Sequence, residues 1–153
     1  MKKLISFCAA FLLVFPVITC ADVVLEDIEG TSISLRSLSG KWVFINYWAS
    51  WCGPCVHEIA ALNRFYAKHS SKVAVFAVNF DAPSLAKQRS LVRQFGIHYP
   101  SLKPQSLRGM HLGDIDVVPV TYVFDPSGHL HTTLYGGQTN RGLQASMAAV
   151  KGV

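Results

Sequence analysis

The chain of 153 residues has few cysteines, few charged residues and no apolar segment of the ~20 residues that a membrane-spanning helix needs. Its four cysteines are too few for a small secreted fold that depends on several disulfide bonds. Only 15% of the residues are charged, and the lysines and arginines are scattered, which argues against a nucleic-acid ligand. The chain also lacks internal repeats, low-complexity tracts and linkers, so its length indicates a single domain.

The start of the chain has the three regions of a secretory signal peptide. A lysine pair next to the first residue is followed by an uncharged, largely apolar stretch over residues 4–18 and by small residues over 19–21. The apolar stretch is too short to span a membrane comfortably, and Pro16 interrupts it. A cleaved signal peptide is therefore the better interpretation, and an uncleaved membrane anchor is the alternative.

The end of this leader adds a third alternative, which is lipid attachment at Cys20. We therefore expect a signal peptide, or a membrane or lipid anchor, over residues 1–21 and one folded domain over residues 22–153. Such a leader places the domain in the periplasm or another extracytoplasmic compartment, either soluble or associated with the inner membrane. Without the leader the chain loses two lysines and no acid, so its net charge falls from +5 to +3. The cysteines that remain are Cys52 and Cys55.

The order of apolar patterns predicts an α/β domain with a mixed sheet. The predicted elements are a hairpin around Glu29-Gly30, strands over residues 41–48, 72–80, 120–125 and 129–135, and helices over residues 55–69, 84–95 and 140–150. A helix that connects two buried strands makes those strands parallel, because a crossover is needed. The short turn over residues 126–128 makes the last two strands antiparallel.

The segment WASWCGPCVHE, residues 48–58, places Cys52 and Cys55 between a predicted strand and a predicted helix. A zinc site needs four ligands, and the histidine that would complete one is missing. Covalent haem attachment needs a histidine directly after the second cysteine, where this chain has Val56. A structural disulfide across so short a loop contributes little stability. Copper capture by the two thiols and His57 is the remaining non-redox alternative.

A redox-active dithiol accounts better for the residues around the pair. Cys52 lies at the predicted helix N-terminus, where free backbone N–H groups and the helix dipole lower the pKa of a thiol. We expect Cys52 to be the attacking nucleophile and Cys55, one turn deeper, to be less exposed and to resolve the mixed disulfide. Pro54 fits the first helical turn, and Gly53 allows a partner chain to approach closely. Trp51 is expected to contact that partner. We expect no metal and no cofactor beyond the redox-active disulfide itself.

The motifs around these residues resemble the thioredoxin superfamily, and within it the TlpA/ResA/DsbE-like extracytoplasmic thiol–disulfide oxidoreductases. The segment that ends in WASWCGPC is the most specific, and VAVFAVNFD, FGIHYPSL and VVPVTYVFDPSGHL follow in the family's order. The resemblance implies a thioredoxin-like three-layer fold with a central mixed β-sheet flanked by helices. It also implies that Pro119 is a cis proline facing the dithiol. The Val118 backbone before it is then expected to bind an extended substrate beside Cys52.

Two further positions bear on proton transfer through this resemblance. Thioredoxins have a buried aspartate six residues before the first cysteine, whereas this chain has Asn46, which cannot titrate. Glu58, one helical turn after Cys55, matches the acidic residue of the C-x-x-C-x-x-E pattern in the ResA-like group. The match implies that Glu58 accepts the proton of Cys55 or tunes the pair. A solvated acid that stabilises the first helical turn is the alternative for Glu58.

Together these features predict an enzyme that exchanges disulfides with protein partners. The CGPC sequence matches thioredoxin and favours reduction of those disulfides. The resemblance further implies a role in cytochrome c maturation, a membrane thiol donor that supplies electrons, and a monomer. A peroxidase is one alternative, because the leading segment also resembles peroxiredoxins, although those use a lone peroxidatic cysteine. A copper-binding thiol chaperone without catalysis is the other.

Overall fold

The computed structural model describes residues 23–148 of the chain, and residues 1–22 and 149–153 lie outside the described part. The expected leader over residues 1–21 falls in the first of these segments, so its nature stays a prediction. Within the described residues, no helix is both long enough and apolar enough to span a membrane.

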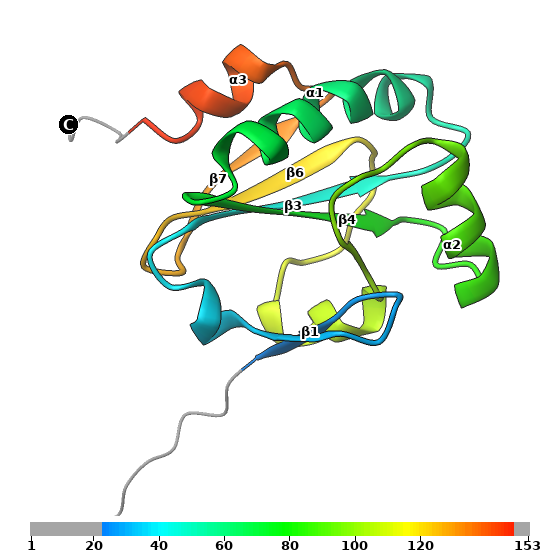
Figure 1. The fold of residues 1–153 in the computed structure, drawn as a ribbon, viewed down its shortest axis with the longest axis horizontal. Helices are drawn as coiled ribbons and strands as arrows, with labels where there is room; N and C mark the ends of the chain where they lie inside the picture. The colour runs from blue at the N-terminus through cyan, green and yellow to red at the C-terminus, as the bar shows by residue number, and fades with distance from the viewer. Residues whose placement is uncertain (1–22, 149–153) are drawn as a thin grey trace, which may run out of the picture.

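A five-stranded sheet lies at the centre of the domain, in the strand order β5-β4-β3-β6-β7 (Figure 1). Its strands are β3 (Trp42–Trp48), β4 (Val73–Asn79), β5 (Ser101–Leu102), β6 (Val120–Phe124) and β7 (Leu130–Tyr135). β3, β4 and β5 are parallel to one another. β6 pairs antiparallel with both β3 and β7. The mixed sheet predicted from the order of elements is therefore confirmed.

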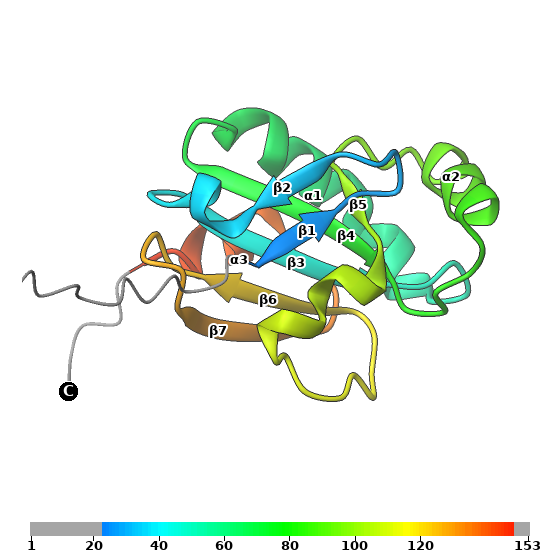
Figure 2. The same ribbon diagram turned by 90° about the horizontal axis from the view of Figure 1, so that it is seen from below.

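Two of the three described α-helices lie over one face of this sheet, the helix over residues 85–94 lies beside the sheet (Figure 1), and a hairpin with two 3-10 helices covers the other face. The helices are α1 (Gly53–His69), α2 (Leu85–Gln94) and α3 (Asn140–Ala145). The opposite layer consists of β1 (Val24–Glu26), β2 (Ser32–Ser34), η1 (Leu35–Leu38) and η2 (Pro104–Met110), and Figure 2 shows β1 and β2 lying across the sheet. The three-layer arrangement implied by the resemblance is confirmed.

Side-chain alternation along β3 connects the two halves of the core. Phe44 and Trp48 point into the apolar cluster beneath the helices, whereas Ile45 and Tyr47 point toward the hairpin. Asn46 has the parity of Phe44 and Trp48 and therefore lies on the helical face. A polar side chain is thus fixed beneath α1 by the pleat of the central strand.

The element boundaries differ from the sequence-based expectation in three places. α1 begins at Gly53, two residues earlier than the apolar spacing indicated. α3 ends at Ala145, and Ser146 follows as its C-cap; the Ser146 hydroxyl donates to the Leu143 carbonyl, which satisfies a group at the helix end. The expected end at residue 150 lies outside the described residues. β5 and η2 occupy a stretch for which the sequence patterns predicted no helix or strand.

Candidate active site

The cysteine pair lies where β3 passes into α1. Cys52 is the N-cap of α1 and has an extended backbone, with φ −89° and ψ 101°. Its sulfur accepts a hydrogen bond from the backbone N–H of Cys55, with 3.2 Å between Sγ and N. Pro54 lies in the first helical turn, as expected. A negative charge on Cys52 Sγ would therefore face an N–H group and the positive end of a helix of 17 residues.

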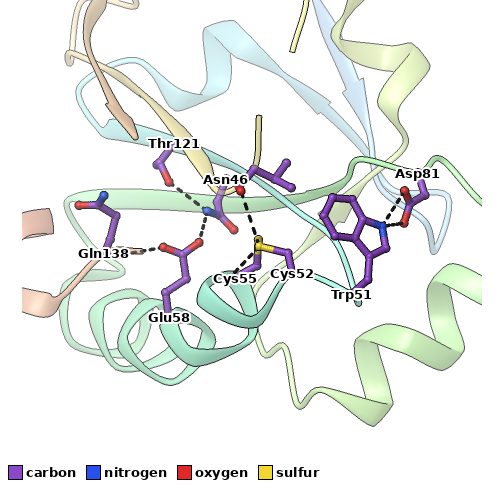
Figure 3. The surroundings of a disulfide bond; sticks show 9 residues. Asn46, Trp51, Cys52, Cys55, Glu58, Asp81, Thr121 and Gln138 are labelled. Carbon is purple, nitrogen blue, oxygen red and sulfur yellow. Dashed lines mark hydrogen bonds between the residues drawn. A yellow bond between two sulfur atoms is a disulfide. The ribbon is translucent and has the colours of Figure 1, made fainter. Parts of the chain in front are cut away.

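The two cysteines form a disulfide bond in the structure, with an S–S distance of 2.06 Å (Figure 3). Cys52 is 5% exposed and Cys55 is fully buried, so the order of exposure agrees with the expectation, although the difference is small. Gly53 lies between them on the surface, and a Cβ atom added to it would meet nothing within 4 Å. The space beside Gly53 is therefore open to an approaching chain.

The loop before β6 faces the disulfide from the other side. Cys52 Sγ lies 3.7 Å from the carbonyl oxygen of Val118. The peptide bond between Val118 and Pro119 is cis, in agreement with the resemblance. A disulfide sulfur has no proton to donate, so this contact becomes a hydrogen bond only when Cys52 is a reduced thiol. The geometry brings the expected nucleophile and the expected substrate-binding backbone together.

Glu58 lies on the buried side of α1, one turn after the second cysteine. Its side chain is only 3% exposed, so the solvated acid considered as an alternative is wrong. Asn46 Nδ2 donates to Oε1 at 2.7 Å, and the backbone N–H of Gln138 donates to Oε2 at 2.7 Å (Figure 3). Burial raises the pKa of Glu58 to about 7, although both hydrogen bonds favour the charged form and oppose the shift. Glu58 can therefore gain or lose a proton near neutral pH.

The sequence-based predictions did not include two members of this hydrogen-bond network, Thr121 and Gln138. Asn46 pairs directly with Thr121 of β6 across the sheet, and its Nδ2 donates to Thr121 Oγ1 at 3.0 Å. Gln138 belongs to the loop between β7 and α3. An available signal was the single polar residue in the apolar run of β3, because a buried amide needs hydrogen-bonding partners. Nothing in the sequence indicated that Gln138 would contribute its backbone.

Trp51 stands on the surface beside the disulfide. It is 65% exposed, and its Nε1 donates to both carboxylate oxygens of Asp81, at 3.1 and 3.0 Å. Its ring meets the ring of Phe80 edge to face, with centroids 6.3 Å apart. Asp81 is itself held by Asn79, whose side-chain oxygen accepts its backbone N–H. An exposed indole is therefore fixed in orientation next to the reactive pair.

Metal binding has no visible support in the described residues. Within residues 23–148, no three side chains of His, Cys, Asp or Glu gather closely enough to hold a metal ion. His57, which was considered as a copper ligand, lies on the exposed face of α1.

Known proteins with similar sequences are named thiol-disulfide oxidoreductases. The sequence model of the AhpC/TSA family matches residues 18–134. Thiol-disulfide oxidoreductase ResA of Halalkalibacterium halodurans is 33% identical over 129 residues, which cover 84% of this chain and 73% of that protein. ResA of Bacillus thuringiensis is 31% identical over 130 residues, with coverages of 83% and 73%.

Solved structures agree with the fold. StoA from Bacillus subtilis has a TM-score of 0.66 at 23% identity, over 82% of this chain and 96% of that one. A DsbF homologue from Corynebacterium diphtheriae has a TM-score of 0.70 at 25% identity, over 82% of each chain. The family match and the ResA relatives extend well beyond the cysteine motif and include the strands that hold it. The chain therefore belongs to the AhpC/TSA family of thioredoxin-like proteins and is a thiol–disulfide oxidoreductase of the ResA type.

Proposed function

We propose that this protein reduces disulfide bonds in partner proteins, with Cys52 as nucleophile, Cys55 as resolving cysteine and Glu58 as proton acceptor. The observation that carries the proposal is the position of Cys52 Sγ. It lies at the N-terminus of α1 and 3.7 Å from the Val118 carbonyl, where the sulfur of an extended partner chain can reach it. The names of the relatives favour disulfide exchange over peroxide reduction and copper capture.

The reaction balances with the residues in place. The Cys52 thiolate attacks one sulfur of the partner's disulfide, and the other partner sulfur leaves as a thiolate. Glu58 then takes the proton from the Cys55 thiol, and the Cys55 thiolate attacks Cys52 Sγ. The bond between Cys52 and the partner breaks, its electron pair leaves with the partner's sulfur, and the Cys52–Cys55 disulfide forms. Two electrons pass to the partner, and a thiol donor must return two electrons to the enzyme.

Partner binding is assigned to the surface around this sulfur. The Val118 carbonyl offers a backbone acceptor, Gly53 leaves open space and Trp51 offers an exposed ring, while Pro54 and Pro119 shape the two sides of the approach. Hydrogen bonds to the partner's main chain give affinity that does not depend on the partner's side chains. Such binding suits an enzyme that acts on disulfides in partners of different sequence.

Trp51→Ala is expected to reduce activity on a protein disulfide selectively. Because the ring is 65% exposed, its loss should change the free energy of unfolding by less than about 1 kcal/mol. Loss of an exposed aromatic contact should lower kcat/KM for insulin disulfides by about tenfold. Reduction of glutathione disulfide should change by less than about twofold, since so small a substrate does not need the ring.

The matched control for this variant is Leu130→Ala. Leu130 is also an exposed apolar residue, at 51%, but it lies at the end of β7 that pairs with Phe124, away from the disulfide. It should leave both activities unchanged. If Trp51→Ala lowered kcat/KM equally for insulin and for glutathione disulfide, the ring would act on the reactivity of the cysteines and not on binding of the partner protein.

The direction of exchange can be measured as a redox potential. We expect an equilibrium titration with glutathione to place the Cys52–Cys55 pair nearer to the value of thioredoxin, about −270 mV, than to that of DsbA, about −120 mV. A potential close to that of DsbA would make the protein an oxidant and would contradict the proposed direction.

We further propose an extracytoplasmic location, a membrane thiol donor and a role in cytochrome c maturation. The leader predicted over residues 1–21 supports the location, and the resemblance to TlpA/ResA/DsbE-like proteins supports the donor and the pathway. A domain over residues 22–153 that acts as a monomer, without a metal or an organic cofactor, is part of the same proposal. Every electron in the reaction above is carried by the two sulfurs, so the cycle needs no other redox group.

A further inference from the structure

Asn46 occupies the centre of the buried network but uses only one end of its amide. Its Nδ2 donates both to Glu58 and to Thr121, whereas its Oδ1 is buried without a hydrogen-bonding partner. A buried amide oxygen that stays unpaired carries a free-energy penalty of about 1–3 kcal/mol. Such a group in the middle of a reactive site calls for an explanation in terms of the chemistry around it.

The explanation lies in what Glu58 needs in each protonation state. As a carboxylate, Glu58 only accepts hydrogen bonds, and the Asn46 NH₂ group supplies one. As a carboxylic acid, Glu58 carries an O–H that needs an acceptor, and an NH₂ group cannot accept. A half-turn of the amide about its Cβ–Cγ bond exchanges Nδ2 for Oδ1, which provides that acceptor. The Thr121 hydroxyl, an acceptor in the first arrangement, becomes a donor in the second.

We propose that Asn46 is a positioning residue that holds the Glu58 carboxyl in both of its protonation states by turning its side-chain amide. Each orientation makes hydrogen bonds to the same two partners, Glu58 and Thr121. The amide donates both bonds in the first orientation and accepts both in the second, and the other end of the amide is unpaired in each. An aspartate at this position would compete with Glu58 for the same proton, and an apolar residue would hold neither state. The inference rests on the proposed role of Glu58 as the proton acceptor of Cys55.

The turn of the amide accompanies the second step of the reaction. The proton of the Cys55 thiol passes to Glu58, and the new O–H of Glu58 donates to Asn46 Oδ1. The Cys55 thiolate then forms the disulfide with Cys52 and releases the partner. When Glu58 returns its proton to solvent, the amide turns back and Nδ2 again donates to the carboxylate. The acid thus stays in place while its hydrogen-bonding character changes.

The titratable neighbours of Glu58 are few in the described part of the chain. On α1 they are Cys52 and Cys55, which do not titrate while they form the disulfide. Tyr99 packs on the same side; burial and the Glu58 charge raise its pKa above the ordinary value, so it stays protonated at neutral pH. The loop between β7 and α3 contributes the Gln138 N–H, and β6 contributes the Thr121 hydroxyl. In the oxidised protein, a titration of this cluster near neutral pH therefore belongs to Glu58.

The test follows two groups of NMR signals in the oxidised protein as pH is varied. The ¹³C resonance of the Glu58 carboxyl and the side-chain amide proton resonances of Asn46 are expected to titrate with one midpoint, because the amide protons leave the carboxylate when it is protonated. Asn79 serves as a control within the same molecule, since it is also buried in the sheet but has no contact with Glu58 among its described hydrogen bonds. Its side-chain amide should not follow that midpoint.

The variant Asn46→Leu gives a second, independent measurement. A hydrogen bond to a charged group is stronger than one to a neutral group, so loss of the Asn46 hydrogen bond should raise the midpoint of Glu58 by about one pH unit. The pH profile for release of glutathione from a Cys52 mixed disulfide should move by the same amount, while alkylation of Cys52 should keep its rate.

Two results would overturn the inference directly. One is an Asn46 amide that does not respond to the titration of Glu58 in the wild-type protein, a measurement that does not depend on any variant folding. The other is a Glu58 midpoint that stays within about 0.3 pH unit in Asn46→Leu. If Glu58→Gln instead leaves the release rate and its pH profile unchanged, the role of Glu58 fails and this inference fails with it. The proposed dithiol function would survive that result as long as Cys52→Ser is inactive.

Discussion

Replacement of Cys52 by serine is expected to lower insulin disulfide reduction by at least about a thousandfold, whereas Cys55→Ser stops the reaction after its first step. Serine has nearly the shape of cysteine but is a far weaker nucleophile, so Cys52→Ser cannot begin the exchange. In Cys55→Ser the first sulfur still attacks, but no second sulfur releases the partner. The partner should therefore remain bound through Cys52.

Acid quenching and non-reducing electrophoresis check this assignment. Cys55→Ser mixed with insulin should give a covalent adduct that dithiothreitol removes, and Cys52→Ser should give none. Each single variant keeps one free thiol at the start of α1, so each variant serves as the control for the other. Equal adduct formation by the two variants would show that the order of the two cysteines is wrong.

The stability of the oxidised protein is expected to fall as pH rises, owing to Glu58. Its pKa is about 7 in the folded protein and near 4.5 in an unfolded chain, so the folded state retains a proton that the unfolded state has lost between these values. The stabilising contribution of the protonated acid is fully present below about pH 4.5 and is lost as pH rises toward 7. The difference in pKa corresponds to about 3 kcal/mol of unfolding free energy.

Urea denaturation without reductant, repeated across this pH range, measures the effect. Glu58→Gln keeps the size of the side chain but cannot ionise, so the unfolding free energy of the wild type minus that of the variant should fall by about 3 kcal/mol between pH 4.5 and pH 7. Glu29→Gln is the matched control, because the Glu29 side chain is 65% exposed and lies in the β1–β2 turn. The prediction fails if the two glutamate variants show the same pH dependence.

The local features of this protein could be predicted from its sequence. The apolar runs predicted β3 and β4, and the turn before His129 predicted the pairing of β6 with β7. The helix predicted over residues 84–95 is α2, with Ser84 as its N-cap. Each of these depends on residues close together in the chain, where alternation, helical spacing and capping act directly. The position of Cys52 at a helix start followed for the same reason.

The environment of Glu58 could not be predicted in this way. Its burial depends on Asn46 and Thr121 meeting across β3 and β6, which are 75 positions apart, and on a backbone N–H from Gln138, 80 positions further along than Glu58. A charged residue on a helix is usually solvated, so local rules favour exposure. The packing of β3, β6 and the loop after β7 against α1 removes the carboxyl from water and thereby raises its pKa.

The near-complete burial of both sulfurs has a consequence for which molecules can serve as clients. We expect a disulfide on an extended, accessible segment to reach Cys52 more readily than one held in a compact protein, because Trp51 and Val118 lie on either side of the nearly buried cysteine. The enzyme would then favour disulfides in extended or incompletely folded chains over those buried in folded proteins.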